Sequence, residues 1–299
     1  MRIGQQVSYF SWPCAPASIG PQFASIARWA ETAGAETLWV MDHLWQIESI
    51  GPPEAEMLEA YTTLGFAAGV TSRIELGAMV GAVTMRNPAL LVKTITTLDV
   101  LSGGRAWMGI GAAWFEAENV GYGLDFPPVA ERFVRLEDTL RLARQMWSGD
   151  DSPFDGEGFT APRPLTSPLP VRTPPVLIGG VGERKTLRMV AQYADATNIF
   201  DGGPEFVGGK LAVLRRHCEE LGRDYDEIRK TVLTRISLSA RGGVAAPSGE
   251  TTMSVAEALD KLGRLAEVGV DTAILGMGND TDEGSYEFLA ELIRQAEAL

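Results

Sequence analysis

Eight short apolar segments alternate with helix-forming segments along the chain, and this alternation constrains the possible folds more than any other feature of the sequence. Nearly all of the apolar segments are continuous runs, which is typical of strands buried on both faces, and regular alternation with helices predicts a parallel sheet. Eight such units in 299 residues fit a (β/α)8 TIM barrel. The predicted strands are residues 3–10, 37–41, 74–80, 106–110, 176–178, 196–200, 230–239 and 271–275.

A doubly wound open sheet is the alternative fold that this pattern leaves open. The sequence G-x-G-x-x-G that usually follows the first strand of such a sheet is absent, since residues 8–13 read Ser-Tyr-Phe-Ser-Trp-Pro. We therefore predict one barrel domain over residues 1–299. A proline-rich segment, residues 148–175, interrupts the pattern between the fourth and fifth strands. Because the same alternation continues on both sides of it, we interpret this segment as a long loop insertion over the surface and not as a domain linker.

The charge balance and the cysteines restrict the partners and the location of the protein. The formal net charge is −13, whereas nucleic acids and anionic membranes need clustered basic residues, so we expect neither as a partner. No apolar run is long enough to span a membrane, and the start of the chain reads as a strand and not as a signal peptide. Two distant cysteines, Cys14 and Cys218, indicate free thiols in a soluble cytoplasmic protein.

A histidine follows the second predicted strand, where a barrel would place its chemistry. The carboxyl ends of the strands of a TIM barrel gather at one mouth, and imidazole titrates near neutral pH. We predict that His43 is catalytic and that Asp42 orients its ring or accepts a backbone hydrogen bond. A structural histidine is the alternative. The other histidine, His217, lies beside two arginines in a predicted helix, and we expect it on a solvated face.

A glycine-rich turn after the fifth strand is the best candidate for an anion site. It consists of Gly179, Gly180, Val181 and Gly182, and two basic residues follow it at positions 184–185. Backbone amides at the start of a helix bind phosphate well. The turn therefore predicts phosphate binding, with a tight turn that holds no ligand as the alternative.

Aromatic residues in the loops predict an apolar pocket at the mouth. Tyr9 and three tryptophans, Trp12, Trp45 and Trp114, follow strand ends and could form the walls of a pocket for a flat ring. The remaining tryptophans fall in predicted helices or strands, where we expect them to contribute to packing. They are Trp29, Trp39, Trp107 and Trp147.

Several other kinds of active site are excluded by what the sequence lacks. Two histidines and two cysteines do not supply a zinc site with sensible spacing, and we predict no metal site. Neither a G-x-S-x-G nucleophile turn nor a P-loop is present. A hydrolase with paired carboxylates remains an alternative, because Asp42 could meet Glu116 or Glu118 across the mouth.

Five segments, together with Asp42-His43, resemble the luciferase-like monooxygenase superfamily. The segments are LGAMV (76–80), RNPALLVKT (86–94), LSGGR (101–105), GIGAAW (109–114) and PVLIGGVGERKTLR (175–188). The resemblance implies a TIM barrel with an insertion between strands 4 and 5 that covers the mouth, and a cofactor that is either reduced FMN or the deazaflavin coenzyme F420. The LSGGR sequence and the low isoelectric point favour the F420-dependent branch.

The resemblance also implies roles for matching positions. Asp42 and His43 match a pair beside the reactive carbon of the cofactor ring, where the histidine handles a proton. Met79 and Val80 match a bulge, often with a cis peptide bond, that supports the ring, and the glycine turn after the fifth strand matches a phosphate cradle. The positions expected to bind the cofactor are Asp42, Met79, Val80, Gly111, Ala112, Ala113, Gly179, Gly180, Val181 and Gly182.

One departure from the family pattern bears on the substrate. Sugar-phosphate dehydrogenases of the F420 branch carry an acid where this chain has Trp114, which puts a sugar phosphate in doubt and favours a larger, less polar substrate. We therefore predict hydride transfer between F420 and a fairly apolar organic molecule. The alternatives are a monooxygenase that uses reduced FMN and oxygen, and a flavin-binding protein without catalysis. The resemblance further implies a homodimer, with residues 60–71 as the candidate interface.

Overall fold

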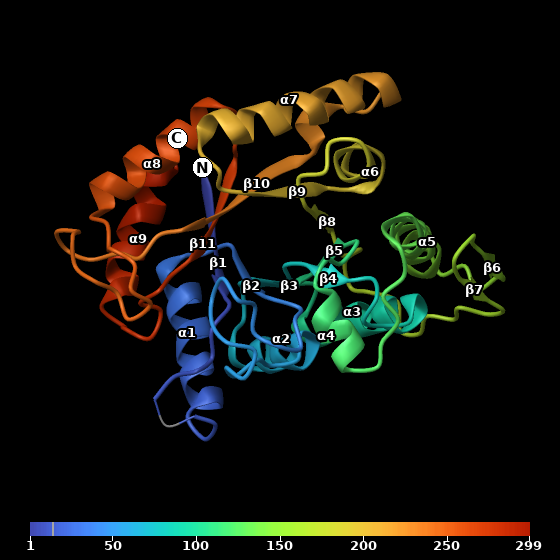
Figure 1. Ribbon diagram of the computed structural model, residues 1–299, viewed down its shortest axis with the longest axis horizontal. Coiled ribbons are helices and arrows are strands. Elements are labelled where there is room, and N and C mark those ends of the chain that lie inside the picture. The colour runs from blue at the N-terminus through green and yellow to red at the C-terminus, as the bar shows by residue number, and fades with distance from the viewer. Residues whose placement is uncertain (14) are drawn as a thin grey trace.

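The computed structural model describes residues 1–13 and 15–299, and in this part of the chain eight parallel strands close into a barrel surrounded by helices (Figure 1). The barrel strands are β1 (Arg2–Val7), β2 (Thr37–Val40), β3 (Glu75–Ala78), β5 (Ala106–Gly111), β8 (Val176–Gly179), β9 (Ala196–Phe200), β10 (Arg229–Arg235) and β11 (Thr272–Gly276). Pairing of β1 with β11 and of β3 with β5 completes the ring. The predicted (β/α)8 barrel is confirmed, and the open sheet is excluded.

Three short strands and the helices complete the description. The short strands are β4 (Gly81–Ala82), which continues β3 and pairs with β5, and the antiparallel hairpin β6 (Phe154–Asp155) and β7 (Thr160–Ala161). The helices are α1 (Ile19–Ala33), α2 (Ala60–Val70), α3 (Pro88–Ser102), α4 (Glu116–Gly121), α5 (Val129–Trp147), α6 (Thr186–Tyr193), α7 (Pro204–Leu221), α8 (Val255–Glu267) and α9 (Ser285–Ala296), with a 3-10 turn, η1 (Tyr225–Glu227). None of the described helices is both long and apolar enough to cross a membrane.

The helix boundaries follow from local chemistry. Asn87 caps α3 by accepting hydrogen bonds from the amides of Ala89 and Leu90, which satisfies donors that have no partner inside the helix. A capping box begins α8, because the side chains of Ser254 and Glu257 each bond to the other residue's backbone amide.

Two tryptophans fill the centre of the barrel. The rings of Trp39 and Trp107 meet edge to face with their centroids 5.7 Å apart, and both are buried. Small residues on the neighbouring strands make room for them, since a Cβ atom on Gly77 would overlap the ring of Trp39. The packing roles predicted for Trp39 and Trp107 are confirmed. Likewise, Trp147 is buried and Trp29 packs against a tyrosine of α9.

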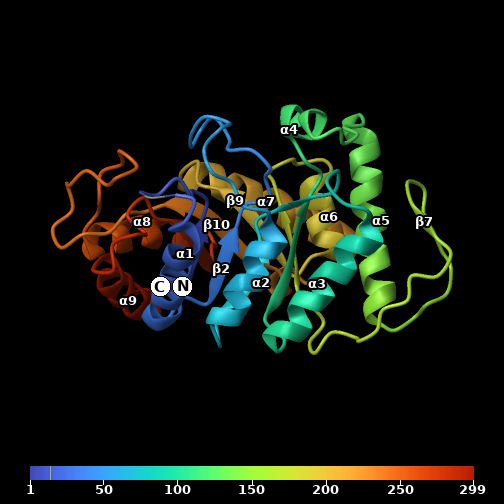
Figure 2. The ribbon, with the colours of Figure 1, turned by 90° about the horizontal axis from the view of Figure 1, so that it is seen from below.

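The long insertion does not cover the mouth, which corrects the expectation drawn from the family resemblance. Residues 148–175 lie along the flank of α5 and α3 (Figure 2). The amide of Gly158 donates to Asp138 in the middle of α5 (2.7 Å), and the amide of Val171 donates to Asp99 in α3 (2.7 Å). Because α5 runs from the mouth back to the opposite end of the barrel, an insertion that follows it starts and finishes at that opposite end.

Other loops surround the mouth instead. Residues 41–59 follow β2, residues 112–128 with α4 follow β5, and residues 236–254 follow β10. Figure 2 shows α4 and the loop after β2 rising from the same end of the barrel. These loops carry the residues that can meet a ligand, as is usual at the carboxyl ends of barrel strands.

Candidate active site

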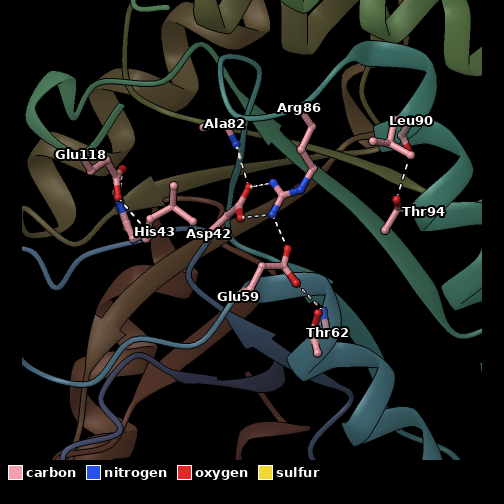
Figure 3. A network of polar contacts seen from close by, with 10 residues as sticks. Asp42, His43, Glu59, Thr62, Ala82, Arg86, Leu90, Thr94 and Glu118 are labelled. Carbon is pink, nitrogen blue, oxygen red and sulfur yellow. Dashed lines mark hydrogen bonds and ion pairs between the residues drawn. The ribbon is translucent and has the colours of Figure 1, made fainter. Parts of the chain in front are cut away.

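Asp42 and His43 follow the end of β2 at Val40, and their side chains point in opposite directions. Trp39 points into the barrel, so His43, four positions later, continues on the inner side, whereas Asp42 faces the surrounding helices. The contacts of the two side chains agree with this geometry (Figure 3). Asp42 meets residues near the starts of α2 and α3, and His43 meets a residue of α4.

Asp42 is the acceptor of a buried ion pair. Both guanidinium nitrogens of Arg86 donate to its two carboxylate oxygens, at 2.7 and 2.9 Å, and the amide of Ala82 donates at 3.2 Å. The Asp42 side chain is 1% exposed and the Arg86 side chain 13%. Arg86 also binds Glu59, the N-cap of α2. This pair therefore ties the end of β2 to β4 and to the starts of two helices.

Arg86 and Glu59 keep their charges in spite of burial. Burial alone would lower the pKa of Arg86, but the Asp42 carboxylate and its hydrogen bonds raise the pKa of this guanidinium above its ordinary value. Burial likewise works against the Glu59 carboxylate, yet hydrogen bonds from Thr62 and Arg86 hold the pKa of Glu59 below its ordinary value. Arg86 and Glu59 are thus charged under ordinary conditions.

His43 pairs with Glu118 and not with Asp42, so the expectation that Asp42 orients the ring is wrong, whereas its alternative role, acceptance of a backbone hydrogen bond, is confirmed by the amide of Ala82. Nδ1 of His43 lies 2.7 Å from Oε1 of Glu118, and the amide of Leu44 donates to Oε2 at 2.7 Å. Glu118 belongs to α4 and is 1% exposed. From the sequence, this acid was expected only as a possible partner of Asp42, because nothing local shows that α4 folds over the end of β2.

Aromatic rings flank the imidazole on the solvent side. The rings of Trp114 and Phe115 stack with centroids 5.1 Å apart, and both meet the His43 ring edge to face, at 5.6 and 5.9 Å. Trp114 is 63% exposed, so a large part of its surface is available to a ligand. Trp45 packs over Gly121, the last residue of α4, and against Tyr122, which directly follows it.

The remaining two pocket candidates, Tyr9 and Trp12, differ in their exposure. Tyr9 is 41% exposed after β1. Trp12 is 6% exposed and packs edge to face on Phe10 within the hydrophobic core. The prediction that Trp12 lines the pocket is therefore wrong, because its ring packs into the hydrophobic core and is almost completely covered.

Three of the predicted cofactor segments meet around the side chain of Val80. A Cβ atom on Gly179 would lie 2.8 Å from one methyl group of Val80, and a Cβ atom on Gly111 would lie 3.0 Å from the other. The Met79-Val80 peptide bond is cis, as the family resemblance implies. The bulge after β3 is therefore in contact with the ends of β5 and β8, and glycine is needed at both facing positions.

An arginine of α5 holds the turn after β5. Nη1 of Arg132 donates to the carbonyl oxygens of Ala112 (3.2 Å) and Ala113 (2.6 Å), and its guanidinium lies over the ring of Phe126. Ala113 has a positive φ of 61°, which side-chain-bearing residues rarely adopt. Arg132 was not identified from the sequence. Its partners are backbone carbonyl groups, which every residue has, so no particular residue type in the sequence indicates the contact.

The glycine turn after β8 offers free amides beside basic side chains. Gly180, with φ 123°, donates to the carbonyl of Asn198 (3.2 Å). Within the described residues, the amides of Val181 and Gly182 donate to no protein acceptor, and residues 184–185 supply two cations beside the start of α6. This donor set suits a phosphate.

His217 supports this turn from α7, which corrects its placement on a solvated face. Its Nε2 lies 2.7 Å from the carbonyl oxygen of Glu183, and only 14% of its side chain is exposed. The prediction of free thiols is confirmed for one of the two cysteines. Cys218 is a buried free thiol, as predicted, whereas Cys14 lies outside the described residues.

Comparison with known proteins agrees with this geometry. The profile of the luciferase-like monooxygenase family matches residues 13–246. The chain belongs to this family. An uncharacterised protein of Mycobacterium tuberculosis is 28% identical over 283 residues, which are 90% of this chain and 92% of that protein. An F420-dependent glucose-6-phosphate dehydrogenase of Tsukamurella paurometabola is 31% identical over 234 residues, which are 73% of this chain but only 65% of the dehydrogenase.

Solved structures of similar fold include an F420-dependent dehydrogenase and a monooxygenase. An F420-dependent secondary alcohol dehydrogenase, in complex with an F420-acetone adduct, has a TM-score of 0.82 at 20% identity and covers 99% of this chain and 98% of its own. The monooxygenase RslO1 from Streptomyces bottropensis has a TM-score of 0.81 at 15% identity, with coverage of 99% and 100%. At these identities the likeness establishes the fold.

Replacement of Arg86 by methionine is expected to destabilise the protein strongly. The change leaves the Asp42 carboxylate buried without its partner, which typically costs about 3–5 kcal/mol. Urea denaturation monitored by circular dichroism measures the loss. The matched control is Arg163→Met, which breaks an exposed pair with Asp151 and should cost no more than about 1 kcal/mol. Equal losses in the two variants would contradict the structural role of Arg86.

Proposed function

We propose that this protein is a coenzyme F420-dependent oxidoreductase that transfers hydride between the deazaflavin and a fairly apolar organic substrate. The observation that carries the proposal is the convergence at one barrel mouth of the Val80 bulge, two glycine-containing strand ends and His43. Family membership and the F420-dependent relatives support the same conclusion. Glucose-6-phosphate dehydrogenases are among these relatives, but the aligned residues cover only 64–65% of the dehydrogenases.

The residues present fit a cofactor with a flat ring and a phosphate. Met79 and Val80 would support one face of the ring, with the turn of Gly111, Ala112 and Ala113, held by Arg132, beside it. The amides of Val181 and Gly182 would hold the phosphate between Gly180 and the basic start of α6. When bound, the cofactor supplies the hydride chemistry. His43 would hold and move the accompanying proton, and Asp42, through Arg86, would keep the end of β2 in place.

The mouth favours an apolar substrate over a sugar phosphate. Trp114 occupies the position after β5 where sugar-phosphate dehydrogenases of the branch carry an acid, and its ring is largely exposed beside Phe115 and His43. A stacked aromatic pair provides apolar contact area for a ligand and no charge to bind a phosphate group. We therefore propose that Trp45, Tyr9 and Trp114 contact the organic part of the substrate.

Two other functions are consistent with the same fold. A monooxygenase that uses reduced FMN and oxygen is favoured by the similarity to solved monooxygenases. A protein that binds a flavin without catalysis would need the same cofactor contacts but not a histidine at the mouth. The choice of cofactor distinguishes the first alternative from our proposal, and the effect of replacing His43 on turnover distinguishes the second.

Titration of the purified protein with F420 and with FMN tests the cofactor. We expect F420 fluorescence to be quenched at lower protein concentration than FMN fluorescence. The Gly179→Val variant should lose binding, because its side chain would occupy the space of Val80. The matched control is Gly209→Val on the exposed face of α7, where an added Cβ meets no atom within 4 Å. Tight binding of FMN alone would contradict the proposal.

Replacement of His43 by alanine tests catalysis. Loss of a group that transfers a proton typically slows turnover by about 10²–10⁴-fold, and the cofactor contacts lie on other strands, so cofactor affinity should be retained. Steady-state kinetics with a panel of alcohols, carbonyl compounds and activated alkenes measures the first effect, and fluorescence titration measures the second. Wild-type turnover by His43→Ala would rule out the proton-transfer role.

We further propose that the protein is a homodimer that uses α2. This helix carries no charged residue, and Phe66 on it is 45% exposed, as is Leu90 of the adjacent α3 at 59%. A face without charge allows two chains of net charge −13 to approach each other. Light scattering should give a dimer mass for the wild type and a monomer mass for Phe66→Glu, and a monomeric wild type would contradict the proposal. The cytoplasmic location stays a prediction from the sequence.

A further inference from the structure

We propose that Glu118 is a positioning residue that keeps the proton of neutral His43 on Nδ1 and so leaves the Nε2 lone pair free at the mouth. The inference rests on the catalytic role proposed for His43 and deepens it. It concerns which of the two ring nitrogens carries the proton, because the two tautomers of imidazole present opposite chemistry to a ligand.

The two oxygens of Glu118 have separate partners. Oε2 accepts from the amides of Leu44 (2.7 Å) and Trp45 (3.4 Å), and Oε1 lies 2.7 Å from Nδ1 of His43. The carboxylate thus binds the imidazole and the two backbone amides that directly follow it in the chain. Because the Glu118 side chain is 1% exposed, water does not compete for these positions.

This arrangement determines where the imidazole proton lies. An ionised carboxylate only accepts hydrogen bonds, so Nδ1 must be the donor in the 2.7 Å contact. The alternative is a protonated Glu118 that donates to Nδ1. That alternative would place the imidazole proton on Nε2, while the amides of Leu44 and Trp45 donate to the other oxygen, Oε2, in either case.

The free nitrogen faces the proposed substrate region. Within the described residues, Nε2 of His43 has no hydrogen-bond partner, and the ring meets the edges of Trp114 and Phe115. In the direction of substrate oxidation, Nε2 would accept the proton of the substrate hydroxyl group, and the bound deazaflavin would supply the acceptor for the hydride. Glu118 then faces the imidazolium it helped to form. In the reverse direction the same N–H returns its proton to a carbonyl oxygen.

The Glu118→Gln variant separates proton placement from packing. A glutamine has nearly the same shape, but only one of its two end groups accepts hydrogen bonds. Its oxygen must stay with the amides of Leu44 and Trp45, so its NH2 group must face Nδ1. Neutral His43 is then required to accept at Nδ1 and to carry its proton on Nε2.

Nitrogen-15 NMR of protein labelled with 15N-histidine shows which ring nitrogen of each histidine carries the proton, at a pH where the rings are neutral. The chain contains only two histidines, so the His43→Ala variant assigns both signals. We expect the Nδ1–H tautomer for His43 in the wild type and the Nε2–H tautomer in Glu118→Gln. The matched control is Glu116→Gln on the exposed face of the same helix, which should leave the tautomer unchanged.

Two results would overturn the inference. One is a wild-type His43 that carries its neutral-state proton on Nε2, and the other is a folded Glu118→Gln variant with an unchanged tautomer. The wild-type spectrum decides the first point even if the variant fails to fold. The measurement needs neither cofactor nor substrate. The expected tautomers without F420 binding would therefore reject the proposed function alone, and F420 binding with the opposite tautomer would reject the inference alone.

Discussion

Closure of the parallel strands into a ring is the constraint on which the rest of the structure depends. Because every strand of the barrel runs in the same direction, all of their carboxyl ends meet at one mouth. The interior must then be filled, and Trp39 with Trp107 fills it because Gly77 leaves room beside them. The bulge at Val80 can touch the ends of β5 and β8 only in a closed ring.

Two buried acids at the mouth perform different tasks because they lie on different sides of the barrel wall. Asp42 faces outwards and is neutralised by Arg86, which joins β2 to the layer of helices. Glu118 reaches His43 from α4 above the mouth and also binds the backbone that follows it. The first pair maintains the framework, and the second sets the orientation of the one histidine at the mouth.

Much of the fold was predictable because its signals are local. Apolar runs gave the strands, amphipathic and small-residue segments gave the helices, and Ser254 with Glu257 marked the start of α8. The insertion at 148–175 was misplaced because its position depends on α5 and not on its own residues. A helix that follows a strand returns the chain to the amino-terminal end of the barrel, so the insertion begins there.

The sequence by itself determined the barrel and the set of residues at its strand ends, including His43, Val80 and the turn that begins at Gly179, since periodicity and turn chemistry operate over a few residues. Only the tertiary structure decided which acid meets His43. The contact with Glu118 joins residues 75 positions apart, and neither residue shows a preference for the other in its local sequence. That choice follows from where α4 packs, and packing is a property of the whole chain.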